Sequence, residues 1–463
     1  MPKNRKKQTG AMLLYLIIII FVFSILMLPI IDVVAKKMQL LRSSADREQA
    51  LQIAEAGINY YQWHLAHYPS DYKDGTNQNG PYVHDYTDFD TQTKIGKFSL
   101  VITQPTVGST IVTIQSTGWT LKNPSVTRVI TAKYGIPSLA KYAFLSNDIV
   151  WIGDTESVSG QLDSNNGIRF DGSGNAPIQS AKSTYTCYAG QGCSSGGQTK
   201  NGVWGSASQA VQAFWQFPVP AVDFSALTSN LASMKASAQS GGIYLPPSNA
   251  QGYSLVFNVA GTVSVYKINS LLSNPTGWDT TGAAHNEYID YNTRTLQFTQ
   301  AIPANGIIYV EDKTWVEGTV NGRVNVVAAK LPYNASTAPT VYIPNNIVYA
   351  SKDGSHVLGL IAQKDIVVTY HAPNNIEIDA ALISQNGGAQ FFYYPNFIKN
   401  TITIYGAIMT FAQWTWSWVN GSNQIVSGYP NTVDNYDSNL LYGPPPSFPF
   451  SSSDYQPLSW ISN

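Results

Sequence analysis

The sequence predicts a mainly β protein that begins with one long α-helix. A charge-free run near the N-terminus continues without a loop into an amphipathic helical pattern. Farther along, short runs rich in β-branched and aromatic residues recur between turn residues. Only 12% of the residues are charged, well below the usual quarter, and this fits an extracytoplasmic body. The expected order is the helix, a small antiparallel β-meander and a right-handed parallel β-solenoid with insertions.

The chain opens with a basic leader peptide, MPKNRKKQTG, at residues 1–10. About 21 residues from Ala11 to Ile31 carry no charge, enough to cross a bilayer core of roughly 30 Å. We therefore expect a transmembrane segment at about residues 11–35. Because cations stay on the cytoplasmic side, the N-terminus is expected inside. The rest of the chain is then extracytoplasmic, in a single-pass protein of the cytoplasmic membrane.

The helical pattern is expected to cover residues 11–68. At 1.5 Å per residue, such a helix is roughly 85 Å long. Pro29 is expected to kink or locally break it. The outer half is amphipathic, with an apolar stripe at helical spacing formed by Ala50, Ala54, Gly57, Ile58, Tyr61 and Leu65.

Residues 49–58, QALQIAEAGI, resemble the corresponding stretch of PilX-type minor pilins, with Ala54, Glu55, Ala56 and Gly57 as the shared motif. The leader that ends at Gly10 and the apolar helix after it also resemble a type IV prepilin. The resemblance implies that a prepilin peptidase cuts between Gly10 and Ala11. It also implies that the helix packs against other pilin subunits, so that the protein reaches the cell surface on a pilus. A plain signal anchor with a stalk helix is the alternative.

One position departs from the family pattern. Major pilins carry a Glu five residues into the mature chain, and this chain has Tyr15 there. The resemblance therefore implies a minor or tip subunit, since a carboxylate that can pair with a neighbouring subunit is missing.

Residues 69–136 are expected to complete a pilin-like head. A polar linker at residues 69–95 comes first, and three alternating runs follow as an antiparallel meander that packs on the helix: residues 97–105, 109–119 and 126–134. The linker's acidic residues could gather a Ca²⁺ ion, but their spacing does not match an EF-hand, and a solvated acidic loop is favoured: Asp71, Asp74, Asp85, Asp88 and Asp90.

Residues 137–415 are expected to form the β-solenoid, with an insertion at about residues 170–299. Apolar runs that begin at Val341, Leu358 and Ile376 are spaced 17 and 18 residues apart. The segments GLIAQKDIVV and IDAALISQNG look like successive versions of one rung. A β-sandwich is the alternative. Within the insertion we expect a lateral strand meander and a short helix from Phe224 to Ala238.

Two cysteines, Cys187 and Cys193, bracket a short loop, and in an oxidising compartment they predict a local disulfide. A zinc site is not expected, because no second Cys pair and no nearby His accompany them. Residues 416–463 form a tail rich in Pro and aromatic residues. We expect this tail to lie along the solenoid or to cap its last coil.

Aromatic clusters are the best candidate binding residues. Trp414, Trp416 and Trp418 alternate, which places them on one face of a strand, and Phe392 and Tyr393 lie in a second cluster, residues 391–394. An exposed face would bind a surface glycan or a protein ligand. An inward face would be core, and this interpretation is favoured.

No catalytic residue, cofactor site or metal site is expected, because HExxH and phosphate-binding glycine motifs are absent from the sequence. The net charge of −1 gives no reason to expect nucleic-acid binding. We expect a structural protein for filament priming, capping or adhesion. The alternatives are a membrane-anchored adhesin outside any filament and a β-solenoid carbohydrate-active enzyme. Such an enzyme would use carboxylates on adjacent coils, for example Asp365, Glu377 and Asp379.

Overall fold

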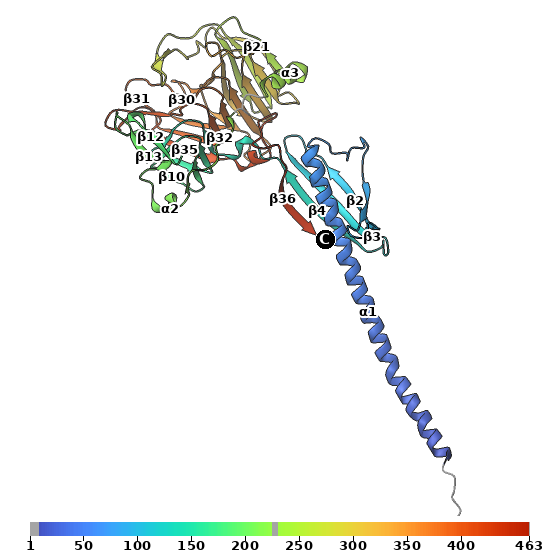
Figure 1. Ribbon diagram of the computed structural model, residues 1–463. Helices are drawn as coiled ribbons and strands as arrows, with labels where there is room; N and C mark the ends of the chain where they lie inside the picture. The colour runs from blue at the N-terminus through green and yellow to red at the C-terminus, as the bar shows by residue number, and fades with distance from the viewer. Residues whose placement is uncertain (1–8, 225–229, 463) are drawn as a thin grey trace, which may run out of the picture. The chain divides into compact units, whose positions relative to one another are not determined.

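The computed structural model describes residues 9–224 and 230–462, with side chains from Met12 onward (Figure 1). The chain forms two compact units. The helical unit contains the described residues up to 104, residues 112–135 and residues 454–462. The stacked unit contains residues 105–111 and 136–453. The stacked unit is therefore inserted into the chain of the helical unit, which the C-terminal segment rejoins.

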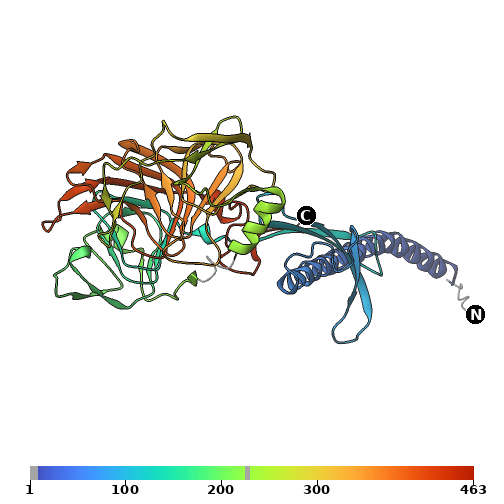
Figure 2. The same ribbon diagram turned by 90° about the horizontal axis from the view of Figure 1, so that it is seen from above.

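The helical unit contains α1 (Thr9–His67), which continues through Pro29, so the break expected there is absent. A five-stranded antiparallel sheet accompanies the helix. In Figures 1 and 2, α1 runs along the face of this sheet. In spatial order the strands are β1 (Tyr82–Thr87), β2 (Lys94–Thr103), β3 (Ile111–Thr120), β4 (Thr127–Gly135) and β36 (Gln456–Ser462). The central three are the predicted meander.

Both edge strands of this sheet differ from expectation. β1 forms within the segment that was expected to be a polar linker. β36 comes from the C-terminal tail, which was expected to lie along the solenoid, but it pairs with β4, with Trp460 opposite Ala132. The register shifts next to Pro457, which has no N–H for a regular ladder. Residues 416–453 of the tail do belong to the stacked unit, with Leu440 and Phe448 buried in it. Only β36 was misplaced, because its pairing partner lies more than 300 residues away in the sequence.

The stacked unit is built around a 21-stranded sheet in which most neighbours are parallel. One column of strands stacks in the order β16 (Ile243–Leu245), β22 (Ile307–Val310), β24 (Arg323–Ala328), β27 (Val357–Ala362), β29 (Asn375–Ser384) and β32 (Thr401–Thr410). It continues through β5 (Phe144–Ser146), β8 (Leu162–Ser164), β11 (Ile178–Ser180) and β15 (Trp215–Gln216). The first strand of the unit, β5, therefore lies in the middle of the stack, on the last coil of the chain.

A second column stacks β23 (Thr314–Val320), β25 (Val341–Ile343), β28 (Ile366–Val368) and β30 (Ala389–Phe391) beside the first. A further strand, β26 (Ile347–Tyr349), pairs with the end of β23 and with β29. The predicted 17- and 18-residue spacing is wrong, because Val341 pairs with Ile366 and Leu358 pairs with Val324. Coil lengths vary: Ile308, Val326, Leu360, Leu382 and Ile408 are stacked at offsets of 18, 34, 22 and 26 residues. The two segments predicted to be successive rungs do stack, with Gly359 opposite Ala381.

The insertion is smaller than expected, because parallel pairing continues from β5 to β15. A lateral antiparallel meander is present, as predicted: β17 (Gly252–Asn258), β18 (Thr262–Ile268) and β21 (Thr295–Ala301). α3 (Leu231–Gly241) lies later than the predicted helix, which in part falls on residues 225–229, outside the described residues.

The remaining elements are short and connect or flank these columns. They are η1 (Leu139–Lys141), β6 (Val150–Ile152), β7 (Ser157–Ser159), β9 (Ile168–Phe170), β10 (Ser173–Gly174), β12 (Thr184–Cys187), η2 (Ala189–Gln191), β13 (Gln198–Asn201), β14 (Val203–Trp204), α2 (Gln209–Gln212), β19 (Gly277–Trp278), β20 (Ala284–His285), β31 (Phe397–Ile398), β33 (Ser417–Val419), β34 (Ile425–Gly428), β35 (Asn431–Tyr436) and η4 (Ser438–Leu441).

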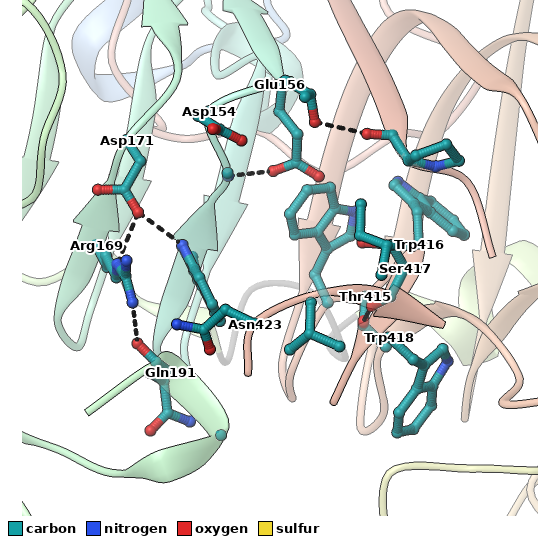
Figure 3. A pocket seen from close by; sticks show the side chains of 18 of the residues that line it. Asp154, Glu156, Arg169, Asp171, Gln191, Thr415, Trp416, Ser417, Trp418 and Asn423 are labelled. Atoms are coloured by element: carbon teal, nitrogen blue, oxygen red, sulfur yellow. Dashed lines mark hydrogen bonds and ion pairs between the residues drawn. The ribbon is translucent and has the colours of Figure 1, made fainter. Parts of the chain in front are cut away.

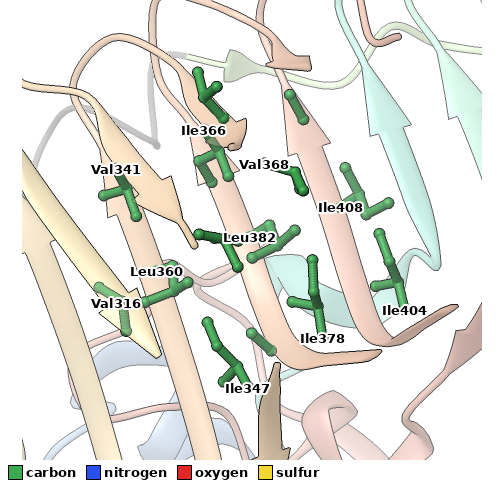
Figure 4. Close-up of a cluster of buried hydrophobic side chains, with 14 of the residues drawn as sticks. Val316, Val341, Ile347, Leu360, Ile366, Val368, Ile378, Leu382, Ile404 and Ile408 are labelled. Carbon is green, nitrogen blue, oxygen red and sulfur yellow. The ribbon is translucent and has the colours of Figure 1, made fainter. Parts of the chain in front are cut away.

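Most strands of the first column are buried on both faces. Leu360, Leu382 and Ile408 point into the main core between the columns (Figure 4). Their neighbours Ile361 and Ile383 point to the opposite face, which α3 and the segment around Phe448 cover. Burial on both faces explains why these strands are continuous apolar runs rather than alternating ones.

Candidate functional site

The first half of α1 is apolar and exposed. Its large hydrophobic side chains from Met12 to Leu41 are all exposed, Met27 least at 38%. The helix is long and apolar enough to be a candidate membrane span, with a mean hydropathy of 3.0 in its most apolar window. Gly10 and Ala11 lie in its first turn.

The second half of α1 packs on the sheet through small residues. A Cβ atom added at Gly118 of β3 would lie 2.3 Å from the carbonyl oxygen of Ala50 and 2.4 Å from the backbone nitrogen of Ala54. A Cβ added at Gly57 would lie 2.3 Å from Oγ of Ser116. The backbones of helix and strand therefore touch, and the small residues of the Ala54–Gly57 motif make this contact sterically feasible.

The predicted apolar stripe is confirmed. Its side chains are fully buried at Ala50, Ala54, Ile58, Tyr61 and Leu65, and Gly57 is buried too. Glu55 and Ala56 are half-buried at its margin. Ile53, which is also fully buried, was missed, although its helical spacing from Gly57 could have identified it.

Four acidic residues of segment 69–95 have separate partners: Asp71, Asp74, Asp85 and Asp88. Asp71 contacts Nε2 of His64 at 3.0 Å, and Asp74 contacts Nε2 of His84 at 2.8 Å. Burial raises the pKa of Asp71, but hydrogen bonds from the backbone N–H groups of Lys73 and Gly75 outweigh it and keep this pKa low. Asp85 pairs with two lysines, and Asp88 accepts hydrogen bonds from Thr91. Among the described residues, no group of three or more His, Cys, Asp or Glu is arranged to hold a metal ion.

The stacked unit contains a cavity of about 590 Å³, which we call the tryptophan pocket (Figure 3). The first coil of the unit, around β6 and β9, supplies one wall, and residues 413–425 of the last coil supply the other. The two coils meet because β5 stacks on β32 and β7 on β35. Its principal lining residues are Trp151, Asp154, Glu156, Arg169, Asp171, Gln191, Trp414, Trp416, Trp418 and Asn423.

Arg169 organises the first wall. Its Nε donates to Asp171 at 2.7 Å, and its Nη1 donates to the carbonyl of Gln191 at 3.1 Å. Its guanidinium carbon lies 4.2 Å from the ring centroid of Trp151. Nε1 of Trp151 also donates to Asp171, at 3.0 Å. Ring, cation and carboxylate are therefore held as one rigid group (Figure 3).

Glu156 is a buried carboxyl at the back of the pocket. It accepts hydrogen bonds from the N–H of Gly153 at 2.6 Å and from Oγ1 of Thr432 at 3.2 Å. Burial nevertheless raises its pKa to about 7. Asp434, buried on β35, has no hydrogen-bond partner among the described residues, and burial together with the charge of Glu156 raises its pKa well above the usual range.

Cys187 and Cys193 are joined in a disulfide with Cα atoms 5.8 Å apart. The loop between them includes η2, and its residues Ala189, Gly190 and Gln191 line the pocket. Because Gln191 is also the residue that Arg169 contacts, the disulfide loop supports the Arg169 wall.

The predicted aromatic residues divide between core and surface. Trp414, Trp416 and Phe392 are buried in the main core. Trp418 and Tyr393 are half-buried, with their rings 5.8 Å apart, and Nε1 of Trp418 donates to the carbonyl of Phe391 at 2.7 Å. The core interpretation is confirmed for the first three. The three tryptophans nevertheless all reach the same pocket.

The carboxylates considered for an enzyme do not form a site together. Lys352 bridges Glu377 and Asp379 at 2.7 and 2.9 Å. Asp365 accepts a hydrogen bond from the N–H of Gly388 at 2.9 Å. None of these three acids lines the tryptophan pocket.

Trp151, Glu156 and Arg169 were missed from the sequence. A signal for two of them exists, because residues 147–152, NDIVWI, and 165–170, NNGIRF, are successive coils. Trp151 lies opposite Arg169 in this register, and Arg169 lies opposite Trp204 in the next one. The 18-residue offset would have predicted that Trp151 and Arg169 are neighbours, but not the next step to Trp204, which is 35 residues from Arg169.

No protein-family model matches the sequence, and no curated protein matches it. Among solved structures, the crystal structure of the competence-associated pilin ComZ from Thermus thermophilus is similar at 12% identity and a TM-score of 0.30. The match covers 90% of this chain and 97% of that chain. A likeness this weak does not identify the function of the chain.

Proposed function

We propose that this protein is a pilin-like subunit of the PilX-type minor class, with a right-handed parallel β-solenoid carried on its head. The proposal rests on the two different halves of α1. The first half is apolar and exposed, and the second half packs against an antiparallel sheet. A helix that is apolar all round is stable only in lipid or among other apolar helices. The membrane, and the same helices of other pilin subunits, are the proposed partners.

The proposed role is structural: priming or capping a filament, or adhesion through the stacked unit. Tyr15 supports a minor or tip position, because it supplies no carboxylate for a neighbouring subunit. The size of the stacked unit, residues 136–453, supports it sterically, since copies at regular shaft spacing would crowd one another. Parallel strands stacked coil on coil support the solenoid. No catalytic role is proposed.

The proposal includes processing by a prepilin peptidase between Gly10 and Ala11, and an orientation with the N-terminus in the cytoplasm. The cations Lys3, Arg5, Lys6 and Lys7 support this orientation. The body is then extracytoplasmic, in the compartment where the Cys187–Cys193 disulfide is stable.

The test is whether the chain enters filaments. Cells that produce the protein are sheared, and the filament fraction is separated from membranes and probed with an antibody against the stacked unit. We expect the chain in the sheared fraction, in low amount relative to the major subunit. A matched variant, Ile18→Asp, places a charge in the apolar half of α1 and is expected to abolish this recovery. Recovery of the native chain in membranes alone would favour a plain membrane-anchored adhesin.

A further inference from the structure

We propose that the tryptophan pocket binds a short neutral oligosaccharide. This binding activity is additional to the structural role proposed above and does not depend on it, because every lining residue lies within the stacked unit.

The size and lining of the pocket fit this ligand class. Its volume of about 590 Å³ lies within the range of roughly 300–1,000 Å³ typical of small-molecule sites. Indole rings from both coils line it, and polar side chains lie between them (Figure 3). A pyranose ring presents C–H groups on its face and hydroxyls at its rim. The half-buried ring of Trp418, together with the polar groups around it, complements such a molecule.

The charges of the pocket disfavour an anion. Arg169 is the only cation among the described lining residues, and Asp171, Gln191 and Trp151 already engage it. Three acids line the same cavity: Asp154, Glu156 and Asp171. A phosphate, an acidic sugar or a nucleic acid would meet these carboxyls without a free positive charge to pair with.

Two polar side chains in the lining of the pocket have free hydrogen-bonding groups. Asp154 and Asn423 are exposed, and neither side chain makes a hydrogen bond within the described part of the chain. A carboxylate accepts from hydroxyl groups, and an amide both donates and accepts. Sugar hydroxyls can satisfy both groups at once.

A quaternary ammonium ion, which also binds between aromatic rings, fits less well. Such a cation binds in a cage of several open ring faces, whereas a pyranose needs only one, and the face of Trp151 is already covered by Arg169. Trp414 and Trp416 are packed edge to face, and both are buried. One small cation would also leave most of the cavity empty.

Binding is measured on the full chain in a polyoxyethylene detergent, since sugar-based and zwitterionic detergents would occupy the pocket. Cello-, malto- and chito-oligosaccharides are the neutral probes. Oligogalacturonate, a short single-stranded DNA and choline are the contrasting ones. Isothermal titration calorimetry gives the affinity, and tryptophan fluorescence reports on the pocket. We expect at least one neutral probe to bind, with an affinity that changes less than about twofold between low and high salt.

Three variants locate the site. Trp418→Ala removes a half-buried wall, and Asp154→Ala removes an exposed acceptor. We expect each to weaken binding about tenfold. Trp63→Ala, an exposed tryptophan of α1, is the matched control and should leave binding within about twofold. If Trp418→Ala does not fold, the exposed Asp154 variant decides the question.

The proposal is overturned if no neutral probe binds, or if only choline binds. It is equally overturned if only the anionic probes bind, with an affinity that falls steeply with salt. Unchanged affinity in the Asp154 variant would place the binding elsewhere and contradict the proposed site.

Discussion

The contact between α1 and β3 allows a direct test of how the helical unit is held together. Gly118→Ala adds one methyl group where the carbonyl of Ala50 and the backbone nitrogen of Ala54 lie 2.3 and 2.4 Å away. Real Cβ atoms do not approach other atoms so closely, and backbone atoms cannot rotate away as the end of a side chain can. Helix and sheet must therefore separate, or the strand must shift.

We expect the variant to lose about 1–3 kcal/mol of the free energy of unfolding of the helical unit, the usual cost of overpacking a well-packed core. For a unit of this size that corresponds to several degrees in Tm. Gly196→Ala, in the stacked unit, is the control for adding a methyl group without a clash, because no atom lies within 4 Å of its added Cβ. It should change the stability by less than about 0.5 kcal/mol.

The assay is hydrogen–deuterium exchange of the full chain in detergent, followed peptide by peptide. Exchange separates the helical unit from the stacked unit, which a single melting curve does not. We expect faster exchange in peptides from β3 and from residues 50–61 of α1, with the stacked unit unchanged. Unchanged exchange in both peptides would refute the conclusion that the helix and strand backbones touch.

Three further predictions concern other parts of the chain. The contribution of Glu156 to the free energy of unfolding of the stacked unit should be fully present below pH 4.5 and should be lost as the pH rises to about 7, because burial raises its pKa from 4.5 to about 7 and the folded state therefore binds the extra proton. Glu156→Gln should remove about 3 kcal/mol of this pH dependence, measured by urea unfolding at several pH values; an unaltered pH profile would contradict the assignment. Arg323→Ala should destabilise the stacked unit by about 3 kcal/mol in the same urea assay. The reason is that its guanidinium donates hydrogen bonds to the carbonyls of Gly108, Gly354, Gly443 and Pro444. A loss below about 0.5 kcal/mol would show that these hydrogen bonds do not stabilise the unit. Deletion of residues 454–463 should expose the edge of β4, because β36 pairs with it. We expect the truncated chain to associate as its concentration rises, measured by light scattering. A truncated chain that associates no more than the native one would argue against the pairing of β36 with β4.

The helical unit was the part most readily predicted from the sequence, because its signals are local. The stripe from Ala50 to Leu65 follows from the helical period alone, and the three central strands follow from alternation. The sequence did not predict which strand each face of the helix and each edge of the sheet would contact. Two contacts depend on residues that are far apart in the chain: Gly118 faces Ala54, and β36 completes the sheet.

In the stacked unit, strand positions were predictable and coil lengths were not. Apolar runs such as residues 357–362 mark strands, but the loops between them differ in length, so equal spacing misassigned Val341 and Leu358. The pocket was unpredictable for a topological reason. It needs Trp151 from the first coil and Trp418 from the last, and only the return of the chain to the middle of the stack brings them together.

The central claim, that α1 is a pilin-like spine, is tested most directly by the mass of the mature N-terminus of the protein isolated from cells. We predict a chain that begins at Ala11, with Gly10→Val blocking the cleavage. A chain from those cells that still carries residues 1–10 would contradict the claim and leave a membrane anchor in its place.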